Sequence, residues 1–380
     1  MNELQQAAGR WRRAGSTLAW LVVAVAPVVI ALGVRRGVPT RVAPAAAVAS
    51  AEAPPEASQS APPAKEPSAP AAIWPRALPA HGLVGVIAPG RPVETDRLER
   101  GLAALRARGL TVKEGAHLRS NNGSYAGSTE QRAADFNAML ADANVAAIWC
   151  ARGGAGCLEL LPRLDWDKVG QRRLPLIGYS DVTLLQLAQF QRCRLIAYSG
   201  PMVAEPHGFG ADHGIDDHTA ADELQWLRLS PPPAAIQPPP RQTWLVVQPG
   251  EAHGPLLGGN LSRIVQLLGT PWLPDFKGAV LLLEETHETA GSVRSMLAKL
   301  ADAGLFRNVN AVVLGDFTDC LPIDELHASV RRALAGRDIP VLSHAPYGHI
   351  LPRSTWPLGA SVRLTTSPPR VAVLDAAGTG

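Results

Sequence analysis

The sequence predicts an α/β fold, in which a parallel sheet with helices on both faces is followed by a smaller mixed α/β domain. Three observations support this prediction. Short apolar runs alternate with amphipathic helical segments through the first part of the folded chain. A proline-rich stretch at residues 230–242 reads as a linker to a second part. That second part alternates in the same way but ends in two closely spaced strand-like runs.

The first domain is expected to span residues 81–229. Its helix at 95–108 illustrates the pattern, because Leu98, Leu102 and Leu105 recur on one stripe. The other helices are predicted at 129–143, 158–161 and 181–190, and the strands at 83–88, 110–112, 145–150, 174–178 and 195–198. In the second domain, residues 243–375, strands are predicted at 279–283, 311–314, 341–342, 362–365 and 371–374, and helices at 261–268, 293–303 and 323–335.

The N-terminal segment, residues 1–36, predicts a secretory signal or a membrane anchor. Arg10, Arg12 and Arg13 precede an apolar run at residues 18–34, and basic residues before such a run are typical of targeting segments. Cleavage is an open alternative, because residues 47–49 read Ala-Val-Ala. Residues 37–80 are rich in Ala, Pro, Ser and Glu, which predicts a disordered spacer. A periplasmic protein, anchored in the inner membrane or secreted, is therefore expected.

The composition excludes several classes of function. The chain has 380 residues, 46% of them hydrophobic and 18% charged, with a net charge of only +3 and no concentrated basic stretch in its folded part. This argues against nucleic-acid binding. Its four cysteines form no C-x-x-C pair, and no Cys/His cluster has zinc spacing, so neither a disulfide scaffold nor a metal site is expected.

Four loops are expected to meet at the carboxyl ends of the parallel strands, where ligands bind in such sheets. They contain Gly90, residues 152–156, Ser180 and residues 199–201. Ser180 lies at a strand-to-helix turn, which suits a nucleophile beside backbone N–H groups but equally suits a helix cap. The glycines at 153, 154 and 156 allow close approach of a ligand, but a phosphate loop would require a G-K-[ST] sequence.

Two further residues could complete a catalytic triad. Glu284 ends a buried strand, from which a carboxylate can orient a histidine, although Glu285 and Glu288 compete for this role. His349 lies in a turn after the strand at 341–342, and it is one of ten histidines. The spacing alone is equally compatible with an exposed strand end and a solvated loop histidine.

An ordered series of short sequence blocks resembles the LD-carboxypeptidases, the muramoyltetrapeptide carboxypeptidases of peptidase family S66. The blocks extend from residue 83 to the end of the folded chain. In order, they are VGVIAP at 84–89, AGSTEQRAAD at 126–135, ARGG at 151–154, LIGYSDVT at 176–183, SGPM at 199–202, LGGNLS at 257–262, LGTPW at 268–272, LE at 283–284 and YGH at 347–349.

The resemblance implies a Ser-His-Glu triad, with Ser180 as the nucleophile, His349 as the base and Glu284 as the residue that orients it. The oxyanion hole would be formed by the backbone N–H groups of Gly154 and Asp181. The family fold implies a flavodoxin-like N-terminal domain and a β-rich C-terminal domain, with the site between them. The implied reaction releases the terminal D-Ala from peptidoglycan stem tetrapeptides without a cofactor, and a homodimer is expected.

This chain departs from the family pattern at positions that could shape the substrate pocket. Gly90 replaces the serine that usually follows Ala-Pro in the family, and Ala155 replaces a tyrosine. Arg152, Ala155 and Asn260 are candidate substrate-binding residues, with Arg152 either facing the substrate carboxylate or serving the fold. Three alternatives stay open, namely an immunity-type peptidase that hydrolyses a peptide-nucleotide toxin, a non-enzymatic wall-binding module, and an α/β-hydrolase. The last would require a G-x-S-x-G sequence, but Val182 stands two residues after Ser180.

Overall fold

The computed structural model describes residues 71–374. The predicted signal or anchor and most of the predicted spacer lie outside the described residues. Within the described part of the chain, no helix combines the length and the apolar character needed to cross a membrane.

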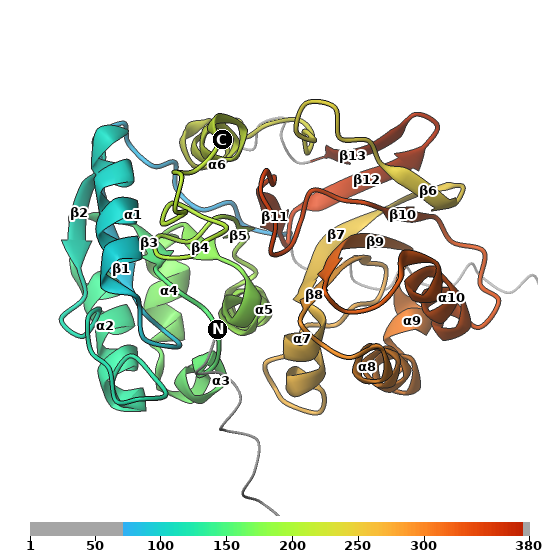
Figure 1. The fold of residues 1–380 in the computed structure, drawn as a ribbon, viewed down its shortest axis with the longest axis horizontal. Helices are drawn as coiled ribbons and strands as arrows, with labels where there is room; N and C mark the ends of the chain where they lie inside the picture. Colours follow the sequence, from blue (N-terminus) through green and yellow to red (C-terminus); the bar gives the residue numbers. More distant parts are fainter. Residues whose placement is uncertain (1–70, 375–380) are drawn as a thin grey trace, which may run out of the picture. The chain divides into compact units, whose positions relative to one another are not determined.

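The N-terminal half forms a six-stranded sheet in the order β11-β5-β4-β3-β1-β2 (Figure 1). Its first five strands along the chain are parallel, and β11 is antiparallel at one edge. The strands are β1 (Leu83–Ile87), β2 (Thr111–Glu114), β3 (Val145–Cys150), β4 (Leu176–Gly178), β5 (Ala197–Ser199) and β11 (Trp356–Leu358). The helices are α1 (Thr95–Ala107), α2 (Thr129–Ala141), α3 (Cys157–Leu160), α4 (Trp166–Arg172), α5 (Thr183–Cys193) and α6 (Asp217–Arg228).

Helices cover both faces of this sheet, because successive side chains of β3 pack into two different hydrophobic clusters. Ile148 packs on one face with residues of α2 and α5, whereas Trp149 packs on the other with residues of α1 and α6. A strand buried on both faces explains the continuous apolar runs in the sequence. The predicted α/β class with a parallel N-terminal sheet is therefore confirmed.

The C-terminal half forms a mixed seven-stranded sheet in the order β13-β12-β7-β8-β9-β10-β6. The central strands β7 to β10 are parallel, β6 and β12 run antiparallel to them at the two sides, and β13 pairs antiparallel with β12. The strands are β6 (Leu245–Gln248), β7 (Glu251–Asn260), β8 (Val280–Thr286), β9 (Ala311–Thr318), β10 (Val341–Ser343), β12 (Ser361–Thr366) and β13 (Pro369–Val373). The helices are α7 (Leu261–Leu267), α8 (Ala290–Asp302), α9 (Leu305–Asn308) and α10 (Ile323–Leu334).

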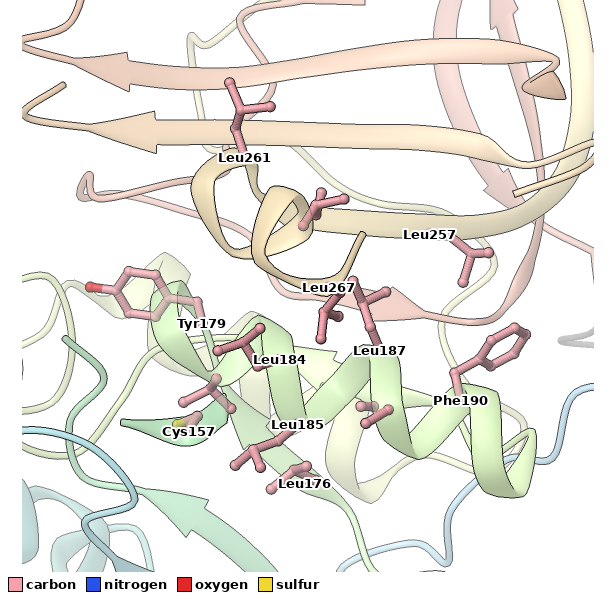
Figure 2. Close-up of a cluster of buried hydrophobic side chains, with 14 of the residues drawn as sticks. Cys157, Leu176, Tyr179, Leu184, Leu185, Leu187, Phe190, Leu257, Leu261 and Leu267 are labelled. Atoms are coloured by element: carbon pink, nitrogen blue, oxygen red, sulfur yellow. The ribbon is translucent and has the colours of Figure 1, made fainter. Parts of the chain in front are cut away.

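The two halves share a hydrophobic core. Figure 2 shows Leu267 of α7 next to Leu187 of α5, and both side chains belong to the same buried cluster as Leu184 and Leu261. Strand β11 strengthens this connection, because it comes late in the chain yet pairs with β5 of the first sheet. The site between the halves is thus built on a continuous core.

Two boundaries predicted from the sequence need correction. The folded part begins before His81, because the Ile73 amide donates a hydrogen bond to the Arg194 carbonyl at 2.8 Å and Leu78 is only 2% exposed. Residues 230–242 are not a free linker, since the Ile236 amide donates to the Val371 carbonyl at 3.0 Å and both residues are buried. The start of the folded part before His81 could not be predicted, because Ala and Pro dominate the sequence around Ile73 and Leu78.

Candidate active site

Ser180 lies in the tight turn that joins β4 to α5. Its φ angle is +61°, in the left-handed region that is energetically costly for a residue other than glycine. A strained serine at a strand-to-helix turn is typical of an exposed nucleophile. Ser180 is half-buried, while its neighbours Tyr179 and Asp181 are buried. The turn therefore keeps the serine accessible while packing fixes both of its neighbours.

Glu284 and His349 form the other part of the predicted triad. The His349 Nδ1–H group donates to Glu284 Oε2 at 2.9 Å, because an ionised carboxylate can only accept. Glu284 is fully buried near the end of β8, where the register against β9 shifts, and His349 lies in the loop between β10 and β11. This hydrogen bond leaves Nε2 of His349 as the nitrogen that can take up a proton.

The environment of His349 raises its pKa. Burial is the largest influence and lowers the pKa, but the charge of Glu284 and its hydrogen bond together outweigh burial. Glu205 also raises the pKa, and Arg353 lowers it. The histidine is thus tuned upward from the usual value of 6.5 by the residue that also orients it.

Ser180 and His349 lie at the same site, because Tyr179, the residue before Ser180, contacts the His349 ring. The Tyr179 and His349 rings meet edge to face, with their centroids 4.9 Å apart. Among the hydrogen bonds of residues 71–374, none joins the Ser180 hydroxyl to His349. Contacts between a nucleophile and its base often tighten only when the substrate is bound.

The glycine loop after β3 packs directly against Ser180. A Cβ atom added to Gly153 would lie 3.2 Å from the Asp181 amide nitrogen and 3.3 Å from Ser180 Cβ. Arg263 of α7 holds the two predicted oxyanion residues together, since it donates to the Gly154 carbonyl at 3.0 Å and pairs with Asp181 Oδ1 at 3.3 Å. Gly154 and Asp181 therefore lie beside the serine, as an oxyanion hole requires.

A buried arginine on α2 fixes the far end of this loop. The Arg132 guanidinium donates to the carbonyl oxygens of Pro89 at 2.6 Å and Gly156 at 2.9 Å. It also pairs with Glu159 at 3.0 Å and stacks over the Tyr125 ring. Arg132 thereby connects three loops at the carboxyl ends of the strands.

The three candidate substrate-binding residues have different placements. Arg152 donates to the Pro92 carbonyl at 2.7 Å and lies 3.5 Å from the Glu205 carboxylate, yet it also lines a pocket of about 530 Å³. Ala155 lines the same pocket. Asn260 is only 2% exposed, donates a hydrogen bond to Glu285 and caps α7. This placement indicates a structural role.

Sequence reasoning missed several residues at the site. Glu205 and His207 lie in the loop after β5, and the His207 and His349 ring centroids are 6.4 Å apart. Burial raises the pKa of Glu205, and the charge of Arg152 opposes this shift. Arg353 is fully buried, stacks 4.0 Å above the Tyr179 ring and donates to the Gly348 carbonyl at 2.9 Å. For the loop after β5, the sequence indicated only residues 199–201 at its start. The path of the rest of that loop, which carries Glu205 and His207, could not be predicted from the sequence.

Cys150 and Cys157 are buried free thiols, and burial raises the pKa of both. Within residues 71–374, no group of three or more His, Cys, Asp or Glu side chains is placed to hold a metal ion. Glu285, a competitor for the role of Glu284, instead accepts from Asn260 and from the Ser262 amide.

Comparison with known proteins identifies the family. Residues 84–200 match the LD-carboxypeptidase N-terminal domain and residues 253–364 match the LD-carboxypeptidase C-terminal domain of peptidase family S66. The chain belongs to the LD-carboxypeptidase family. The N-terminal match contains Ser180, and the C-terminal match contains Glu284 and His349. The predicted family is therefore confirmed, and the protein is a peptidase.

Two of the relatives are named as murein peptide carboxypeptidases. The probable murein peptide carboxypeptidase of Bacillus subtilis is 31% identical over 309 residues, which cover 80% of this chain and 94% of the relative. The murein tetrapeptide carboxypeptidase of Pseudomonas aeruginosa is 32% identical over 293 residues, covering 75% and 94%. Because each relative is matched over nearly its full length, the likeness extends to both halves of the site.

Solved structures match the same fold. The muramoyltetrapeptide carboxypeptidase of Oxalobacter formigenes superposes with a TM-score of 0.67 at 25% identity, covering 77% of this chain and 97% of that chain. The microcin C7 self immunity protein MccF in its wild type apo state gives a TM-score of 0.75 at 21% identity, covering 80% and 98%. This LD-carboxypeptidase family member thus shares its two-sheet fold with both kinds of protein.

Proposed function

We propose that this protein is a serine LD-carboxypeptidase that releases the terminal D-Ala from peptidoglycan stem tetrapeptides. The hydrogen bond between His349 and the buried Glu284, beside the strained Ser180 turn, is the observation that carries the proposal. The names of the relatives from B. subtilis and P. aeruginosa support the substrate class. A non-enzymatic wall-binding module would not need a strained serine near a histidine that is hydrogen-bonded to a buried carboxylate, so the arrangement argues against that alternative.

In the proposed mechanism, Ser180 attacks the carbonyl carbon that precedes the terminal D-Ala. Nε2 of His349 takes the hydroxyl proton as the new C–O bond forms, and the buried Glu284 carboxylate stabilises the resulting imidazolium. His349 then gives this proton to the departing amine of D-Ala as the C–N bond breaks. An acyl-enzyme ester on Ser180 remains.

Water completes the cycle by the same route. His349 removes a proton from the water that attacks the ester, and then returns a proton to the Ser180 oxygen as the shortened peptide leaves. In both halves the backbone N–H groups of Gly154 and Asp181 stabilise the negative carbonyl oxygen. One such donor contributes roughly 3–4 kcal/mol in enzymes where it has been removed.

A second candidate function is hydrolysis of a peptide-nucleotide conjugate, as in toxin immunity. The likeness to MccF over 80% of this chain favours keeping it. Incubating the purified protein with a murein tetrapeptide and, separately, with an aminoacyl sulfamoyl adenosine distinguishes the two. Release of D-Ala from the tetrapeptide alone supports the carboxypeptidase, whereas turnover of the nucleotide conjugate alone contradicts it.

We also propose that residues 1–36 deliver the folded part to the periplasm, as a signal or as an inner-membrane anchor. The basic residues before the apolar run at 18–34 support this proposal. A C-terminal reporter enzyme that is active only outside the cytoplasm should be active on the full chain and inactive after deletion of residues 1–36. Equal reporter activity with and without residues 1–36 would contradict export. Homodimer formation stays a prediction, for which sedimentation velocity is the test.

A further inference from the structure

A surface pocket next to the glycine loop has an excess of positive charge. It has a volume of about 530 Å³ and is bounded by three loops that carry Arg91, residues 121–125 and Arg152. Asn121, Ser124 and Tyr125 add further polar groups, while Ala155 contributes only a methyl group. The lining therefore suits a polar ligand.

The walls of this pocket are fixed by hydrogen bonds. The Tyr125 amide donates to Asn122 Oδ1 at 2.8 Å, and the Ala126 amide donates to the Gly90 carbonyl at 3.0 Å. The buried Arg132 guanidinium lies over the Tyr125 ring, with its Cζ atom 4.8 Å from the ring centroid. A binding site with such ordered walls loses little conformational entropy when a ligand enters.

The charges around the pocket leave one arginine without a counterion. Glu94 pairs with Arg97 at 3.2 Å, and Arg152 lies 3.5 Å from Glu205. Within residues 71–374, the Arg91 guanidinium makes no ion pair or hydrogen bond. Arg91 thus offers its full set of donors, and Arg152 keeps donors beyond the one that binds the Pro92 carbonyl.

Arg91 is also close to the reacting centre. Its amide donates to the Gly153 carbonyl at 2.9 Å, and a Cβ atom added to Gly154 would lie 2.7 Å from the Arg91 side chain. Gly154 is one of the proposed oxyanion residues. A peptide whose carbonyl lies in the oxyanion hole must therefore pass near Arg91.

We propose that Arg91 and Arg152 form a subsite that binds a carboxylate of the substrate peptide. This inference rests on the proposed function. Arginine forks match the planar geometry of a carboxylate, and the Arg91 charge is otherwise uncompensated. A murein stem peptide offers this group both at its C-terminal D-Ala and on its D-glutamyl residue.

Binding to an inactive protein tests the subsite separately from catalysis. Calorimetry would use the full chain carrying Ser180→Ala, alone and combined with Arg91→Gln. Three peptides would be compared, namely L-Ala-γ-D-Glu-L-Lys-D-Ala, its D-glutamyl α-amide and its C-terminal amide. Arg106→Gln is the matched control, because Arg106 lies on α1, is half-exposed and does not line the pocket.

Arg91→Gln should raise the Kd of the free-acid peptide about ten- to hundredfold, the range expected for a lost hydrogen bond to a charged group. Arg106→Gln should leave this Kd unchanged. For one of the two amides Arg91→Gln should have no further effect, and that amide identifies which carboxylate occupies the subsite. An equal effect of Arg91→Gln on all three peptides, no effect on any, or no binding of the free acid would overturn the inference. Failure of the proposed function would appear separately, as absent D-Ala release by the wild-type protein.

Discussion

The protonation of His349 depends mainly on two opposing influences at the scale of single residues. Burial favours the neutral imidazole, whereas the Glu284 carboxylate favours the imidazolium and prevails. Because a general base must be neutral before it acts, activity should rise with pH through the raised pKa. The rising limb of kcat/KM is therefore expected to have its midpoint above the usual histidine value of about 6.5.

Replacing Glu284 with Gln should move that limb. The change removes the two largest influences that raise the pKa of His349 and leaves only the weaker one of Glu205, so burial and Arg353 should then lower the pKa below its usual value. Turnover should also fall, by roughly two to four orders of magnitude, because the imidazolium loses its counterion. A pH profile of kcat/KM measures both effects, with Glu251→Gln, an exposed carboxylate on β7, as control. An unshifted limb in Glu284→Gln would argue against the assigned pair.

Arg263 gives a second prediction at this scale. Since it binds both the Gly154 carbonyl and the Asp181 carboxylate, Arg263→Met should loosen the oxyanion hole. We expect kcat to fall about tenfold with little change in KM, as for a contact that matters mainly in the transition state. Arg263→Lys should recover part of the loss by keeping the charge beside Asp181. A raised KM with unchanged kcat would instead mean that Arg263 serves substrate binding.

The sequence indicated the proposed triad more directly than it indicated the residues around it. Ser180, Glu284 and His349 lie in short blocks whose order along the chain is specific, although each residue alone had an ordinary explanation. Glu205 and Arg353 could not be found in this way, because each reaches the site through a loop whose path depends on tertiary packing. Asn260 was a candidate substrate-binding residue, but its side chain caps α7 and donates a hydrogen bond to Glu285.

At the scale of elements, helix α6 carries two buried carboxyl groups that affect stability. Burial raises the pKa of Glu223 to about 8, against the opposing hydrogen bond from Thr355. In the unfolded chain a glutamate titrates near 4.3, so the folded state holds a proton that the unfolded state loses. The stabilisation is fully present below pH of about 4.3 and is lost as the pH rises through about 8.

Glu223→Gln should therefore flatten the dependence of stability on pH. The free energy of unfolding of the wild-type protein should decline between pH 5 and 8 more steeply than that of the variant. A shallower slope should remain in the variant, because burial also raises the pKa of Asp222 to about 7. Urea unfolding at several pH values measures the slopes. Identical slopes would mean that Glu223 is ionised in the folded protein.

Strands that contain a strong apolar run could be predicted from the sequence. Short strands that pair with a segment far away in the sequence could not. The run at 83–88 corresponds to β1, and the run at 279–283 corresponds to the start of β8. Strand β11 has only three residues, with Pro357 at its centre, so neither length nor periodicity marks it. Its pairing with β5 depends on contacts between distant segments, which no local pattern encodes.

At the scale of the whole molecule, the two sheets depend on each other. Strand β11 crosses from the C-terminal half into the first sheet, and α5 and α7 share one apolar cluster. The folded part should therefore unfold in a single cooperative transition, despite its two sheets. Tryptophan fluorescence and far-UV circular dichroism should give coincident urea curves. Two separated transitions would show that the halves are independent domains.

The central claim is that Ser180 catalyses removal of the terminal D-Ala from stem tetrapeptides. Its most direct test is mass spectrometry of tetrapeptide muropeptides after incubation with the wild-type protein and with Ser180→Ala. The account predicts that the wild-type protein converts tetrapeptides to tripeptides with loss of one alanine, while Ser180→Ala leaves them intact and keeps a similar thermal stability. Conversion by Ser180→Ala at the wild-type rate would contradict the assignment.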